Sequence, residues 1–103
     1  MKNRIIAYLM NLGIRPHYTG FNYLVSALEI AMGSEAKKPA LEIYRLVAEE
    51  HGVSANRVER CIRTAIQMYC QKELGQTDQK FKNSEFIYLC VMNMRMMSEE
   101  ETH

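Results

Sequence analysis

The sequence contains little that would support a secreted, membrane-spanning or covalently cross-linked protein. Its 103 residues include only three cysteines, an odd number without a CxxC pair. They predict neither a disulfide framework nor a zinc site, and they fit the reducing environment of a cytoplasmic protein. No apolar run approaches the roughly 20 residues of a membrane span. The short run IIAYLM, residues 5–10, lacks a signal-peptide cleavage site and is expected to lie in a first helix.

The sequence also lacks the residue sets that predict catalysis. It has no Ser-His-Asp arrangement, no glycine-rich phosphate loop and no paired metal ligands, so we expect no enzyme, no cofactor, no metal and no small-molecule substrate. The net charge of +1 excludes a protein that coats nucleic acid through its bulk charge. Any surface for double-stranded DNA must therefore be a local patch of cations, and the glutamates at 99–101 offset part of that charge in the total.

Every periodic segment of the chain favours a helix, and no alternating run with turn chemistry demands a strand. We therefore predict an all-α fold, a compact bundle of about five helices containing a helix-turn-helix. The helices are expected to begin at Lys2, after an N-cap at Thr19, with Pro39 in a first turn, after an N-cap at Ser54, and after Asn83 or Ser84. The polar stretch 74–82 is expected to be a loop.

The apolar residues within these segments predict which helix faces are buried. The third helix is expected to bury Leu41, Tyr44, Val47 and Ala48. The last is expected to bury Phe86, Ile87, Cys90, Val91 and Met94. A chain of this length forms one domain, so we place a single helix-turn-helix domain at 1–98 and an acidic tail at 99–103.

The stretch SANRVERCIRTAI, residues 54–66, has the strongest separation of polar from apolar residues. At about 100° per residue, its apolar side chains occupy one half of the helix and its polar ones the other. The polar half is expected to present Arg57, Glu59, Arg60, Arg63, Thr64 and Gln67. Such a face is either an ordinary solvated surface or a surface that contacts DNA.

The preceding segment favours DNA contact. A helix-turn-helix needs a small residue in its first helix, a glycine in the turn and an apolar anchor in its second helix. Counting from Tyr44, Ala48 is fifth, Gly52 ninth and Val58 fifteenth, which is this arrangement, with the motif at about 44–63. The alternative is a plain helical hairpin.

Arginine and glutamate on the early turns of such a second helix suit the chemistry of base recognition. The guanidinium fork matches O6 and N7 of guanine, and a carboxylate accepts from N4 of cytosine. We predict Arg57, Glu59 and Arg60 as base-reading residues. The alternative for Glu59 is an ion pair with Arg63 at i, i+4, and the two roles are compatible.

Other polar residues are expected to contact the DNA backbone. They are Arg63, Asn56, Ser54, His17 and Lys82. The alternatives are a turn-stabilising hydrogen bond for His17, simple capping at the helix starts and solvated loop charges.

Several segments together resemble a known family. SANRVERCIRTAIQ with YRLVAEEHGV before it, LGIRPHYTGFNYLVSAL and NSEFIYL are similar to the C-terminal DNA-binding effector domain of the stage-zero sporulation response regulator (sporulation protein A). The resemblance implies an all-helical fold and sequence-specific DNA binding that controls transcription. It also implies that Arg57, Glu59 and Arg60 match the base-reading positions of the family, and that Arg63 matches a position near the backbone.

The sequence departs from that family in two ways. It has no phosphoacceptor receiver domain, so it is expected to be either an excised domain or a stand-alone protein, and its methionine start and acidic end favour the stand-alone protein. The segment from Cys70 to Lys82 is shorter than in the family, where it belongs to contacts between neighbouring domains and with the transcription machinery. The shorter segment argues against cooperative tandem binding and polymerase activation. RNA polymerase and, through the surplus methionines, a second copy of the chain remain further candidate partners. The alternative function is a protein-interaction module that has lost DNA reading and binds another regulator through its methionine-rich last helix.

Overall fold

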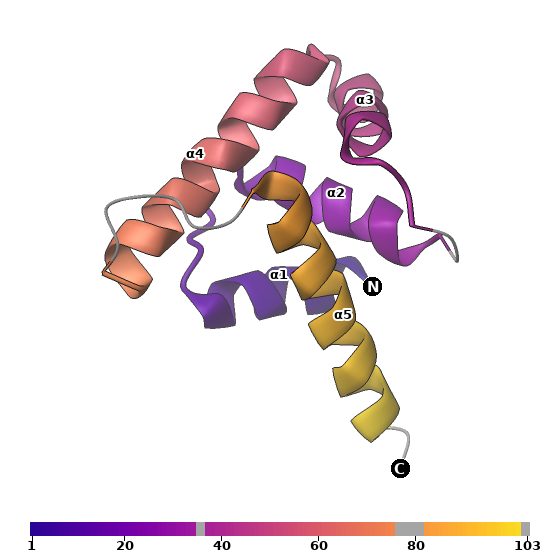
Figure 1. The fold of residues 1–103 in the computed structure, drawn as a ribbon, viewed down its shortest axis with the longest axis vertical. Coiled ribbons are helices and arrows are strands. Elements are labelled where there is room, and N and C mark those ends of the chain that lie inside the picture. The colour runs from indigo at the N-terminus through magenta and orange to yellow at the C-terminus, as the bar shows by residue number, and fades with distance from the viewer. Residues whose placement is uncertain (35–36, 76–81, 102–103) are drawn as a thin grey trace.

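The protein is a bundle of helices, seen in a computed structural model that describes residues 1–34, 37–75 and 82–101, with side chains through Met97 (Figure 1). Within these ranges there is no strand, and the predicted all-α fold is confirmed. The helices are α1 (Lys2–Leu12), α2 (Phe21–Met32), α3 (Ala40–His51), α4 (Ala55–Glu73) and α5 (Asn83–Glu101).

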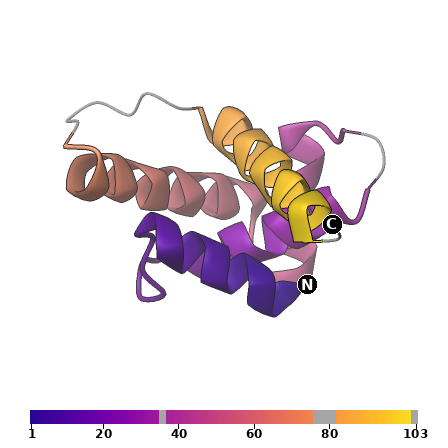
Figure 2. The same cartoon turned by 90° about the horizontal axis from the view of Figure 1, so that it is seen from below.

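Helix α2 is the centre of the bundle, because it packs against each of the other four helices (Figures 1 and 2). Its sequence FNYLVSALEIAM contains a single charged residue, Glu29, and a helix that is apolar around most of its surface is stable only when covered on several sides. Leu24, Val25, Ala27 and Leu28 are each at most 2% exposed. Helix α4 is therefore supported from behind by a largely buried helix.

The inner faces predicted for the third and last helices are largely those observed. All five predicted inner residues of α5 are buried, as are Tyr44, Val47 and Ala48 of α3. The prediction that Leu41 is buried is wrong, because its side chain is 80% exposed and Ile43 is buried instead. Both residues lie in the first turn of α3, where the apolar pattern of the sequence allows either to face the core.

The helix ends differ more from the expectations than the helix faces do. Ser54 caps α4 as predicted, since its hydroxyl accepts a hydrogen bond from the Arg57 amide at 3.1 Å. Thr19 is not a cap: α2 begins at Phe21, after Gly20, and has no side-chain cap bond. Pro39 precedes α3 instead of lying in its first turn, so its fixed φ sets the entry of the chain.

The start of α5 also corrects an expectation. Helix α5 begins at Asn83, and the amide of Phe86 donates to the carbonyl of Lys82, which places Lys82 in the capping position. Asn83 and Ser84 are therefore first-turn residues and not caps. The Asn83 side chain instead contacts α4.

The chain outside these helices bears on the remaining expectations. Of the segment from Cys70 to Lys82 that is short relative to the family, residues 70–73 belong to α4, residues 74, 75 and 82 are non-helical, and residues 76–81 lie outside the described residues. Residues 99–101 of the acidic end continue α5, and residues 102–103 lie outside the described part. All three cysteines are free thiols. In the described ranges, no helix combines the length and apolar character needed to cross a bilayer.

Gly52 forms the bend between α3 and α4 in the left-handed conformation, with φ of +67°. We predict that Gly52→Ala destabilises the protein by about 1 kcal/mol, because an L-residue is strained there, although no atom lies within 4 Å of the added Cβ. Gly52→Asn is expected to be less destabilising, since asparagine tolerates this conformation better. Urea unfolding measures both. Equal stability of the alanine variant and the wild type would contradict the prediction.

Candidate nucleic-acid interface

Helices α3 and α4 form the predicted helix-turn-helix. The amide of Gly52 closes the end of α3 on the Ala48 carbonyl, and the Val53 amide donates to the same oxygen at 3.0 Å. Ala48 and Val58, the small residue and the apolar anchor of the motif, are 6% and 0% exposed. Figure 1 shows α3 nearly end-on while α4 lies across the view, so the two helices cross steeply.

One flank of α4 is held by the loop between α1 and α2. At Gly20 this loop comes so close that an added Cβ would overlap the Cys61 carbonyl oxygen and lie 2.9 Å from the Ile62 amide nitrogen. Farther along α4, the Lys72 ammonium lies 5.6 Å from the centre of the Tyr18 ring. The loop therefore follows α4 from its last turns to its middle.

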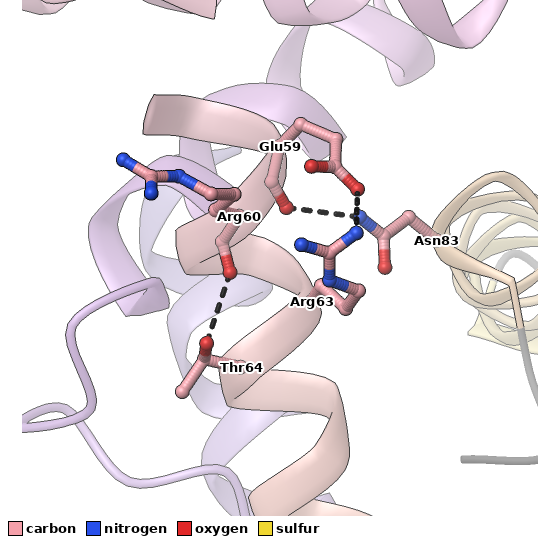
Figure 3. Close-up of polar contacts among 5 residues, drawn as sticks. All are labelled: Glu59, Arg60, Arg63, Thr64 and Asn83. Atoms are coloured by element: carbon pink, nitrogen blue, oxygen red, sulfur yellow. Dashed lines mark hydrogen bonds and ion pairs between the residues drawn. The ribbon is translucent and has the colours of Figure 1, made fainter. Parts of the chain in front are cut away.

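The opposite flank of α4 is held by the first turn of α5 (Figure 3). The Asn83 side-chain amide donates to the backbone carbonyl of Glu59 at 3.1 Å, and Asn83 is 7% exposed. A buried amide must have partners, so this bond ties the start of α5 to one position on α4. Helix α4 is thus fixed from both sides as well as from behind.

Between these flanks, the polar half of α4 faces outward as predicted. Arg57, Arg60, Arg63, Thr64 and Gln67 are exposed, and Glu59 is half-buried. The opposite side enters the core through Val58, Ile62, Ala65, Ile66 and Cys70, all fully buried. The outer face carries three guanidinium groups and one carboxylate on the early and middle turns of the second helix.

Arg57 is oriented by α2. Its Nε donates to the Tyr23 hydroxyl at 3.2 Å, and the Tyr23 ring packs edge-on against His51, with ring centres 5.1 Å apart. The hydrogen bond with Tyr23 raises the pKa of Arg57, so the side chain keeps its charge. The terminal guanidinium nitrogens make no hydrogen bond within the described residues, and these are the atoms that form a fork toward a base.

Arg60 has a different environment. Its guanidinium points away from Glu59, Arg63 and Asn83 (Figure 3). The nearby Thr64 hydroxyl donates at 3.0 Å to the backbone carbonyl of Arg60 and not to its side chain. Among the described residues, no group pairs with the Arg60 guanidinium.

Arg63 and Glu59 form the i, i+4 ion pair that was the alternative role for Glu59, with Nη1 and Oε1 2.9 Å apart. Their side chains are 48% and 33% exposed, so the pair is worth only a few tenths of a kcal/mol. A group that binds Arg63 or Glu59 more strongly than they bind each other can therefore break this ion pair.

This geometry agrees with a comparison of the whole sequence with known families. The family model described as "Sporulation initiation factor Spo0A C terminal" matches residues 5–94. The chain belongs to this family. The Spo0A C-terminal family is the DNA-binding effector domain of a sporulation regulator, a regulatory domain and not an enzyme. The resemblance inferred from the sequence segments is confirmed.

The remaining residues expected at the backbone lie around α4 of this Spo0A-type domain. Ser54 and Asn56 are exposed at its start. His17 is exposed in the loop on one flank and packs edge-on against Tyr18, with ring centres 5.1 Å apart; its ring makes no turn-stabilising hydrogen bond within the described residues. Lys82 is exposed on the other flank.

The flank of α4 next to α5 brings together residues that are far apart in the sequence of this Spo0A-type domain. Lys82, Asn83, Arg63 and Glu59 line one open hollow beside α4, with Tyr44 among the other lining residues. Burial raises the pKa of Tyr44, which stays a neutral hydroxyl there. His17 lies on the loop at the opposite edge, so the structure does not bring it together with Lys82.

Sequence reasoning missed the residues that support the arginine face. The Tyr23 hydroxyl accepts a hydrogen bond from Arg57. The Nε2 atom of His51, whose ring packs against Tyr23, lies 2.8 Å from the Ser26 hydroxyl. Neither contact has a local sequence signal, because the partners are 34 and 25 residues apart. Within the described residues, no group of three metal-ligating side chains occurs.

Proposed function

We propose that this domain is a sequence-specific regulator of transcription that places α4 in the major groove of double-stranded DNA. The observation that carries the proposal is the arginine face. Arg57 and Arg60 stand exposed on the first two turns of the second helix of a helix-turn-helix, the part that reaches base edges in this motif. Their terminal nitrogens have no partner within the described residues, so no hydrogen bond needs to break before they meet a base.

We assign base reading to Arg57, Glu59 and Arg60. Arg60 lies at the middle of the outward arc, between the flank held by Gly20 and the flank held by Asn83. It is therefore the best placed to point straight into the groove and to bond a guanine with both of its terminal nitrogens. Glu59 is the proposed acceptor for a cytosine amine, once Arg63 has left it.

We assign backbone contacts to the groups around this centre. Arg63, one turn beyond Arg60, can exchange Glu59 for a phosphate, because a surface ion pair contributes little. The Ser54 hydroxyl accepts from the Arg57 amide and keeps its own hydrogen for donation. Asn56 and Ser54 lie at the helix start, and the outer residues are His17 on one edge and Lys82 on the other.

A salt titration of binding tests the proposal. Each phosphate neutralised by a cation releases counterions, so log K is expected to fall with log salt by about 0.9 per phosphate. Arg63→Ala is expected to weaken binding to all duplexes alike and to reduce this slope by about 1. Fluorescence anisotropy with an operator selected from a random duplex pool, and with an unrelated duplex, measures both quantities.

The control for this titration is Arg95→Ala, which also removes one exposed guanidinium but does so on α5. It is expected to leave the slope unchanged. Salt-insensitive binding of equal strength to every duplex would contradict the proposal. So would a loss of slope in the Arg95 variant as large as that in the Arg63 variant.

A second candidate function is a protein-interaction module of the same fold that binds another regulator. It is favoured by one observation, the exposed apolar side chains of α5, including Leu89, Met92 and Met96. RNA polymerase is a further proposed partner of a transcription regulator of this family. The salt titration separates the two functions, since an apolar contact with a protein depends little on counterion release.

A further inference from the structure

The hydrogen bond between Tyr23 and Arg57 joins α2, which supports α4 from behind, to the outward face of α4. Nε of Arg57 donates to the Tyr23 hydroxyl oxygen at 3.2 Å. A guanidinium group has five N–H hydrogens, one on Nε and two on each terminal nitrogen. The bond uses the Nε hydrogen and, within the described residues, leaves the four hydrogens of Nη1 and Nη2 without an acceptor. One edge of the group is therefore held while its end stays open.

This use of Nε selects one way for Arg57 to contact a base. The planar fork of an arginine can meet two acceptors with both terminal nitrogens, or with Nε and one terminal nitrogen. Because Tyr23 occupies Nε, only the contact through both terminal nitrogens remains. That contact matches O6 and N7 of a guanine in the major groove.

The Tyr23 ring is held in place by the end of α3. It packs edge-on against the His51 ring, with ring centres 5.1 Å apart and an angle of 83° between the ring planes. Nε2 of His51 lies 2.8 Å from the hydroxyl oxygen of Ser26, which is 5% exposed. Tyr23 and Ser26 are three residues apart on α2, so they lie on the same face of that helix. Two residues of α2 thus hold the His51 ring, and this ring limits the motion of Tyr23.

We infer that Tyr23 is a positioning residue for base recognition, because its hydroxyl holds the Arg57 guanidinium with both terminal nitrogens directed at the same guanine. The inference rests on the proposed reading of DNA by α4. It deepens that proposal by naming a residue outside α4 that determines how well one base pair is distinguished from the others.

The physical basis is the order of the Arg57 side chain before DNA arrives. An exposed arginine samples many rotamers, and a partner that binds it must supply the free energy to order it. The Tyr23 hydroxyl supplies this order in the free protein, and it adds no opposing charge. Glu59 holds Arg63 differently, since a phosphate must replace it, whereas Tyr23 uses a nitrogen that the guanine does not need.

The experiment compares the full chain with its Tyr23→Phe variant on the selected operator and on duplexes that change it one base pair at a time. Arg57→Ala first identifies the base pair that Arg57 distinguishes. Tyr23→Phe is expected to reduce discrimination at that base pair by roughly 2- to 12-fold, the cost of ordering one long side chain on binding. Discrimination at the other base pairs, including the one read by Arg60, is expected to stay unchanged. The salt slope is also expected to stay unchanged, because no cation is removed.

Tyr88→Phe is the matched control. Tyr88 is 44% exposed on α5, so this variant removes a similar hydroxyl far along the chain from α4. It is expected to leave discrimination at every base pair unchanged. Phenylalanine at position 23 keeps the ring that packs on His51, and circular dichroism checks that the Tyr23→Phe chain is folded.

A double-mutant cycle separates positioning from other roles of Tyr23. In a chain that already carries Arg57→Ala, Tyr23→Phe is expected to have no further effect on binding, because the hydroxyl acts only through Arg57. Equal weakening by Tyr23→Phe with and without Arg57 would mean that Tyr23 contacts DNA itself or supports the fold, and it would overturn the inference. Full discrimination by a folded Tyr23→Phe chain would also overturn it.

The same measurements distinguish failure of this inference from failure of the proposed function. If Arg57→Ala lost discrimination at one base pair and Tyr23→Phe lost none, only the positioning role would be wrong. If Arg57→Ala left discrimination intact at every base pair, the assignment of base reading to Arg57 would be wrong, and the role of Tyr23 with it.

Discussion

Arg60→Ala is expected to lower the affinity for the selected operator by roughly 5- to 150-fold, the equivalent of about 1–3 kcal/mol. The affinity for unrelated duplexes is expected to change far less. The reason is the position of Arg60 at the centre of the outward face of α4, with no partner for its guanidinium among the described residues. Competition binding of operator against random duplex measures this loss of preference.

Two further variants make the Arg60 experiment specific. Arg60→Lys keeps the positive charge but loses the planar fork, so it is expected to behave more like alanine than like arginine in the choice of sequence. Arg95→Ala removes a guanidinium from α5 and is expected to leave the preference intact. If Arg60→Lys retained full discrimination, charge alone would explain the contact and bidentate base reading would be wrong.

Gly20→Ala is expected to destabilise the fold by about 2–4 kcal/mol, which lowers the Tm of a domain of this size by more than about 8 °C. The added Cβ would overlap the Cys61 carbonyl oxygen and lie 2.6 Å from its carbonyl carbon. Both atoms belong to the backbone of α4, which cannot yield as the end of a flexible side chain can. The loop must therefore move away from α4. Thermal unfolding followed by circular dichroism measures the effect.

Gly33→Ala is the matched control for this substitution. Gly33 follows α2 in the right-handed helical conformation, and its added Cβ would lie 3.3 Å from the Glu29 carbonyl oxygen, a tight contact with backbone one helical turn earlier. We expect stability within about 0.5 kcal/mol of wild type, because alanine in compatible backbone also restricts the unfolded chain. A Tm for Gly20→Ala that matched that of Gly33→Ala would show that the close approach to α4 is not required.

The sequence predicted which helices form and which faces they bury, because both depend on the spacing of apolar residues along one segment. Helix α4 separates its polar and apolar sides as its periodicity indicates. Helix starts were less predictable. Thr19 and Pro39 are both residues that favour a helix start. In the structure, however, α2 and α3 each begin one residue later than predicted, at Phe21 and Ala40.

The candidate site was predictable to the same extent. The outward direction of Arg57, Arg60 and Arg63 follows from periodicity, and the Glu59–Arg63 pair follows from their four-residue separation. The Tyr23–Arg57 bond and the Asn83–Glu59 bond could not be predicted. They join different helices, and their geometry depends on how α2 and α5 pack against α4.

The Glu59–Arg63 pair gives the proposed complex a means of rejecting wrong sequences. When Arg63 binds a phosphate of the DNA, the Glu59 carboxylate loses its ion-pair partner at the same time as water is expelled from the groove. An uncompensated carboxylate in that setting is strongly unfavourable unless a base offers an amine hydrogen. A duplex with an acceptor at that place meets repulsion, so discrimination there arises from the misfit of the competitors as much as from attraction to the correct partner.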